Sequence, residues 1–169
     1  MGIAIAQSHF DLYSSKAGFI VSTCGALGVF ALLSMGYIAI FLNDLQMIIY
    51  GMVVMIAGVF TLVATDDDGN NPTWLYVIAI FLIYSIGYPV GHTAVIGLFS
   101  KIIGRRPQGT LLGWFASAGS LARITFPIMS GYIVHFVSYE TLFITLVVIL
   151  GFAIFITTTS KETLLKLSS

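Results

Sequence analysis

Charged side chains are scarce in this sequence. Only 8% of its 169 residues are Asp, Glu, Lys or Arg, whereas 58% are hydrophobic, and the mean hydropathy is +1.01. A soluble domain carries about 25% charged residues, so this composition cannot supply a water-facing surface. The few charges fall in short gaps between long apolar runs. The sequence therefore excludes a soluble globular domain and predicts a polytopic membrane protein.

Residues with catalytic or metal-binding chemistry are also few. The single cysteine, Cys24, lies inside an apolar run and is expected to be a buried, inert thiol. The three histidines, at positions 9, 92 and 135, do not have the spacing of a zinc site. No Ser/His/Asp or Cys/His set stands out. We therefore expect neither an enzyme nor a bound cofactor or metal, and no nucleic-acid partner.

Five apolar runs reach the roughly 20 residues that cross a bilayer core of about 30 Å. They are Ala17–Leu42, Gln46–Thr65, Thr73–Ser100, Gly109–Phe136 and Tyr139–Ser160. In lipid a continuous segment must satisfy its own backbone N–H and C=O groups, so runs of this length form helices. The sequence predicts an all-α, multi-pass integral membrane protein with five transmembrane helices in a lipid bilayer.

Basic residues near the ends of the runs predict the orientation, because Lys and Arg are retained on the cytoplasmic side. Five of the seven follow the third and fifth runs: Lys101, Arg105, Arg106, Lys161 and Lys166. Both gaps then lie in the cytoplasm, together with the turn at Asn43 and Asp44. The acidic cluster at 66–68 lies on the opposite side.

The third run contains Pro89 between Gly87 and Gly91. Proline removes one helical hydrogen bond, and glycine lowers the resistance to bending. We predict a kink or break here. Interrupted membrane helices tend to be buried in protein or to line a wet cavity. A simple packing kink is the alternative, since Gly and Pro are common in membrane helices.

Arg123 lies deep within the fourth run, about 21 Å from its start at Gly109 by helical rise. An arginine at the membrane centre costs about 2.5–3.5 kcal/mol on insertion scales, so it is expected to face protein or water. Small residues precede it, and spacings such as Gly113 with Ser117 are typical of close helix contacts. These contacts would place the helix inside a bundle.

Two roles remain open for Arg123. Its guanidinium could bind an anion through two parallel hydrogen bonds, or it could tie down carbonyls freed near Pro89. His92, Tyr88 and Tyr84 lie at successive turns of the third run and could line the same cavity. His92 suits a proton relay, although a histidine satisfied by a backbone carbonyl is the alternative. These four residues form the candidate substrate-binding site.

The stretch from "GYPVG" through "SKIIGRRPQGTLLGWFASAGSLARITFP", within Gly87–Gly131, resembles one family. It is similar to the last third of major facilitator superfamily transporters. Within them it resembles the lysosomal branch associated with neuronal ceroid lipofuscinosis, which is related to vacuolar carriers fused to SPX domains. Phe126 departs from the pattern, because a small residue is expected before the proline.

The resemblance implies that residues 1–169 are a partial domain whose five spans correspond to helices 8 to 12 of a twelve-helix carrier. Residues 1–16 would then hold the remnant of a preceding helix, and His92 and Arg123 would border a midplane site. The implied function is alternating-access transport across an endolysosomal membrane, together with a missing N-terminal half or another copy. With Arg123 as the fixed positive site, the leading hypothesis is that the solute is small and anionic. A passive anion channel on the same fold and a non-transporting fragment or assembly partner are the alternatives.

Overall fold

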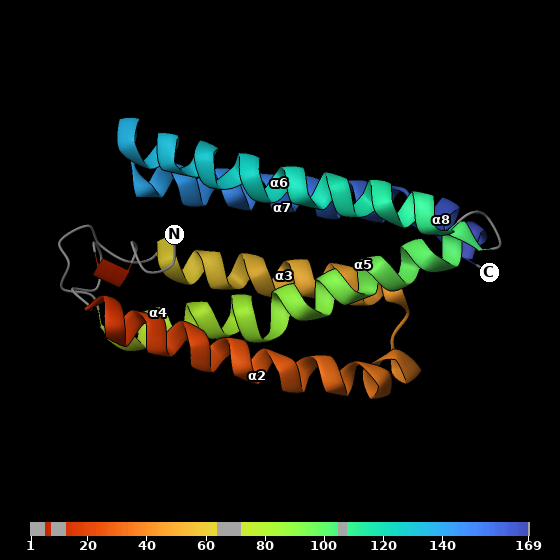
Figure 1. The fold of residues 1–169 in the computed structure, drawn as a ribbon, viewed down its shortest axis with the longest axis horizontal. Coiled ribbons are helices and arrows are strands. Elements are labelled where there is room, and N and C mark those ends of the chain that lie inside the picture. Colours follow the sequence, from red (N-terminus) through yellow and green to blue (C-terminus); the bar gives the residue numbers. More distant parts are fainter. Residues whose placement is uncertain (1–5, 8–12, 64–71, 105–107, 169) are drawn as a thin grey trace.

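The computed structural model describes residues 6–7, 13–63, 72–104 and 108–168, and every regular element in them is helical (Figure 1). The elements are α2 (Ser14–Phe41), α3 (Asp44–Val63), α4 (Thr73–Ile80), the π-helix η1 (Phe81–Gly87), α5 (Tyr88–Ile103), α6 (Gln108–Phe136), α7 (Tyr139–Thr159) and α8 (Lys161–Ser168). The acidic cluster at 66–68, Arg105, Arg106 and most of residues 1–12 lie outside the described residues.

The protein is an all-α membrane protein. Within the described ranges, four helical segments are long and apolar enough to cross a membrane, namely α2, α3, the continuous segment Thr73–Ile103 and α7. The fourth predicted span corresponds to α6, which has 29 residues and therefore the length to cross. It is less apolar than the other spans because it contains Arg123 and many Gly, Ser and Thr residues.

The helices form a bundle centred on α3 and the bent segment α4–η1–α5. α2 packs on one side of this centre, while α6 and α7 run together along the other (Figure 1). α3 packs against α5, η1 and α7. The centre of the bundle is therefore built by the second and third predicted spans.

One end of the bundle gathers the residues that the charge pattern predicts on one side. The Lys101 ammonium lies 2.6 Å from a carboxylate oxygen of Asp44, and Leu164 of α8 packs on the apolar cluster that contains Leu45 and Leu98. The cytoplasmic location of this end remains a prediction from the basic residues.

Glycines allow two pairs of helices to touch through their backbones. A Cβ on Gly51 of α3 would lie 2.8 Å from the Cα of Gly91 in α5, and one on Gly58 would lie 3.1 Å from the Ala79 carbonyl oxygen. Close approach through small residues is a common basis of helix association in membranes. The third span therefore uses Gly91 as a packing surface against α3.

The small residues of α6 do not have this role. A Cβ added to Gly113 or Gly119 would meet nothing within 4 Å, and α6 supplies no fully buried residue among those described. The expectation that these residues pack α6 inside a bundle is wrong for contacts within the described chain. The reason is positional, because α6 pairs mainly with α7 at the edge of the structure and only touches α5.

The winding of the third span changes immediately before Pro89. In η1 the backbone N–H of Tyr88 donates to the carbonyl oxygen of Ile83, five residues back. The Tyr84 carbonyl would then accept from residue 89, but proline has no N–H. A Cβ on Gly28 would lie 2.9 Å from this carbonyl oxygen. Glycine at position 28 thus lets α2 approach the carbonyl that the proline leaves free.

Candidate functional site

Arg123 lies near the middle of α6, and its side chain is exposed at the surface of the described chain. The half-buried residues of α6 that precede Phe126 recur at helical spacing, at Leu111, Leu112, Phe115, Gly119 and Ala122. They form the stripe that faces the rest of the bundle. Arg123 follows Gly119 by one turn, so it sits at the edge of this stripe and not on the opposite face.

The hydroxyl groups around Arg123 are satisfied within α6 itself. Ser120 donates to the Ala116 carbonyl at 3.0 Å, and Thr125 donates to the Leu121 carbonyl at 2.9 Å. Such bonds to the preceding turn are the usual solution for Ser and Thr in membrane helices. In the described ranges, no hydrogen bond or ion pair involves the guanidinium of Arg123. Among the described residues, its positive charge therefore has no partner.

Tyr88 and His92 stack on each other along α5. Their ring centroids are 5.3 Å apart with an interplanar angle of 30°, which is the geometry expected for rings one turn apart. Tyr88 is 46% exposed and His92 is half-buried. The pair lies on a face of α5 that the described helices leave partly uncovered.

Two pairs of aromatic residues show how the third span and α6 are aligned along their lengths. Phe99 stacks on Phe115 with centroids 4.8 Å apart, and Tyr84 and Phe126 border one cavity. The two helices run in opposite directions between these points. Tyr88 and His92 lie between Phe99 and Tyr84 and are consequently level with the part of α6 that ends at Arg123. Among the described interactions, however, none joins Arg123 to either ring.

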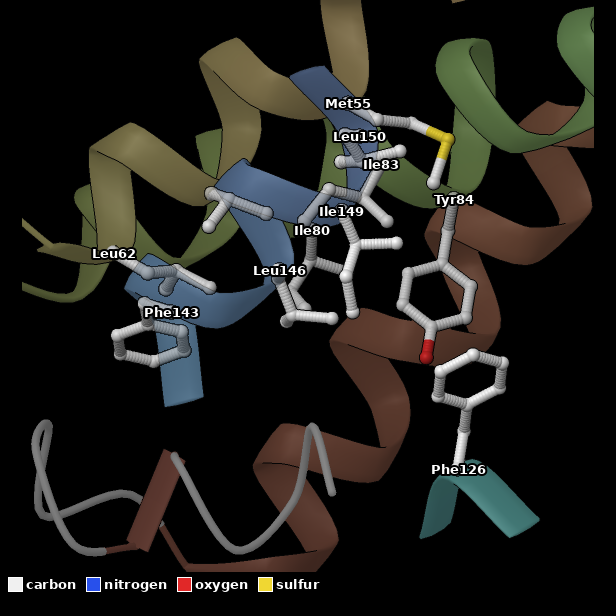
Figure 2. A pocket seen from close by; sticks show the side chains of 11 residues that line it. Met55, Leu62, Ile80, Ile83, Tyr84, Phe126, Phe143, Leu146, Ile149 and Leu150 are labelled. Atoms are coloured by element: carbon white, nitrogen blue, oxygen red, sulfur yellow. The ribbon is translucent and has the colours of Figure 1, made fainter. Parts of the chain in front are cut away.

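The cavity between α3, the third span, α6 and α7 has a volume of ≈ 320 Å³ (Figure 2). Its lining residues are Met55, Val59, Leu62, Ile80, Ile83, Tyr84, Phe126, Phe143, Leu146, Ile149 and Leu150. Figure 2 shows the Tyr84 hydroxyl pointing toward the ring of Phe126. Of the four predicted site residues, only Tyr84 lines this cavity.

Sequence reasoning missed two polar contacts between helices, one in η1 beside Tyr84 and one at the end of the bundle. Ser85 is 2% exposed and donates a hydrogen bond of 2.7 Å to the Cys24 carbonyl, so it links η1 to α2. The Asp44–Lys101 ion pair joins α3 to α5. A single serine in an apolar run is expected to form a hydrogen bond, but the identity of its partner depends on how the helices pack.

Comparison with known proteins adds independent information. A sequence profile of the Major Facilitator Superfamily matches residues 1–166. A 47-residue segment is 43% identical to "Major facilitator superfamily domain-containing protein 8" of Xenopus laevis, and it covers 28% of this chain and 9% of that protein. The chain thus aligns with only a small part of this curated relative. No solved structure matches it significantly.

Proposed function

The chain belongs to the major facilitator superfamily, and we propose that it forms the C-terminal half of a secondary transporter for a small anionic solute. The observation that supports this proposal most strongly is the position of Arg123. A permanently charged guanidinium lies in the middle of a membrane-length helix, and no carboxylate of the described residues neutralises it. An ionisable residue in such a position marks a transport pathway or a buried pair.

The role of the neighbouring residues follows from the register of α5 and α6. Tyr88 and His92 lie level with the segment that ends at Arg123, so they would face the same solute from the opposite helix. In this proposal Arg123 supplies the fixed positive charge, Tyr88 and Tyr84 supply hydroxyl donors, and His92 is the proton-linked group.

The rest of the carrier would come from a second six-helix half, or from another copy of this chain. Transporters of this type bind substrate near the midplane between two halves that rock about it. The exposed Arg123 and the exposed Tyr88 support this arrangement, because a facing half would enclose both. We place the carrier in an endolysosomal membrane on the resemblance of Gly87–Gly131 to the lysosomal branch.

Transport by reconstituted protein tests the proposal. We expect Arg123→Gln to abolish anion uptake into proteoliposomes, with unchanged expression and thermal stability, and Arg123→Lys to retain part of it. The matched control is Leu121→Gln on the opposite face of the same helix, which should transport normally. Undiminished uptake by Arg123→Gln would refute the anion-site assignment. A current that needs no counter-ion and saturates weakly would identify a channel instead of a carrier.

A further inference from the structure

The cavity beside α6 is unlike a site for a small inorganic anion. Apart from the Tyr84 hydroxyl, its lining side chains are hydrocarbon or thioether. An inorganic anion placed there would lose its hydration without gaining hydrogen bonds, which is strongly unfavourable. We propose that the solute is an amphipathic anion, whose alkyl chain occupies this cavity while its charged head group binds Arg123. This inference rests on the proposed function and names its substrate class.

The dimensions of the cavity fit a single medium-length chain. Its volume of ≈ 320 Å³ lies at the lower end of the range of about 300–1,000 Å³ for ligand pockets. Along α7 it extends from Phe143 to Leu150, two helical turns or about 11 Å. Burial of each additional methylene there should raise affinity roughly fourfold.

The α6–α7 hairpin places Arg123 at one end of this cavity. The two helices are joined at Val137 and Ser138, so residues equally far from this turn are level. Leu150 follows Ser138 by twelve residues, and Arg123 precedes Val137 by fourteen. The guanidinium-bearing residue is therefore about 3 Å in helical rise beyond the last cavity residue of α7. Phe126, which lines the cavity, lies less than one turn from Arg123.

Charge complementarity favours this occupant over an apolar one. An apolar helix face or a membrane lipid tail could also fill a hydrocarbon cavity, but either would leave Arg123 without the anion that it lacks among the described residues. An amphipathic monoanion satisfies both requirements at once. Its head group would lie level with Tyr88, whose hydroxyl is a further donor.

Photolabelling tests the proposal directly. The complete protein in lipid nanodiscs is exposed to a diazirine-bearing dodecanoate, and the labelled residues are located by mass spectrometry. We expect labelling on the cavity walls, near Phe126 and Leu146, and competition by dodecanoate but not by acetate. Arg123→Gln should reduce labelling by roughly tenfold or more and should not affect labelling by the uncharged alcohol analogue.

A cavity-filling variant separates this site from nonspecific lipid contact. Leu146→Trp should abolish labelling, whereas Val148→Trp on the same helix, where Val148 is 64% exposed, should leave it unchanged. The proposal is overturned if Leu146→Trp labels normally. It is also overturned if the carboxylate and the alcohol label equally, which would indicate a lipid tail, or if neither labels, which would indicate an occluding helix.

The two proposals fail in different ways. If acetate or chloride is transported in an Arg123-dependent manner while dodecanoate neither binds nor competes, the amphipathic substrate is wrong and the anion transporter stands. If Arg123→Gln transports every tested anion normally, the anion transporter itself is wrong.

Discussion

The hydroxyl of Ser85 donates a hydrogen bond of 2.7 Å to the backbone carbonyl oxygen of Cys24, which joins the π-helical turn of the third span to α2. The bond lies beside Gly28, where α2 meets the carbonyl of Tyr84. The register of η1, and with it the direction of Tyr84 and Tyr88, is therefore held from the neighbouring helix. Each of these contacts can be removed separately.

Replacing Ser85 with alanine should destabilise the protein by about 0.6–1.5 kcal/mol, the range for a hydrogen bond between membrane helices or in a protein core. Thermal unfolding in detergent measures the change. Ser120→Ala is the matched control, because that exposed hydroxyl bonds only within α6 and should have little effect. Equal stability of the two variants would show that the hydrogen bond from Ser85 to α2 does not contribute to the stability of the protein.

Replacing Gly51 with alanine should destabilise the bundle by about 1–3 kcal/mol, because the new Cβ would press on the backbone of Gly91 and the helices would have to separate. The comparison is Gly113→Ala, whose Cβ meets open space. That substitution should be neutral or stabilise by up to about 1 kcal/mol, since alanine favours helix. Similar unfolding temperatures for both variants would contradict the packing at Gly51.

The ion pair between Asp44 and Lys101 should contribute less than about 1 kcal/mol, because the Lys101 side chain is 58% exposed and solvent screens such pairs. A double-mutant cycle with Asp44→Asn and Lys101→Gln measures the coupling. We expect it to fall further in high salt. A coupling of several kcal/mol, insensitive to salt, would mean that the pair is buried by another part of the carrier.

Much of the architecture could be predicted from apolar runs and charge placement. The predicted Tyr139–Ser160 differs by one residue from α7, and the third run extends as one helical segment to Ile103. Asp44 and Lys101, assigned to one side from the basic residues, meet as an ion pair. These features depend on local hydrophobicity and on charge retention, which a single sequence contains.

The arrangement of helix faces could not be predicted in the same way. In lipid both the outer and the inner surfaces of a helix are apolar, so the sequence of α6 carries little information about which face packs. Small residues suggested close contacts for α6, yet the close contacts form at Gly51 and Gly91. The π-helical turn and the partner of Ser85 likewise depend on where α2 and α3 lie relative to the third span. The sequence pattern does not give these positions.

Anion transport by this protein requires that Arg123 faces a water-accessible site and not lipid. Accessibility of a cysteine at this position tests it most directly, in a background with Cys24→Ala. We predict that Arg123→Cys reacts rapidly with a membrane-impermeant anionic sulfonate reagent, whereas Leu121→Cys on the opposite face of α6 reacts slowly. Equal, slow reaction at both positions would contradict the account.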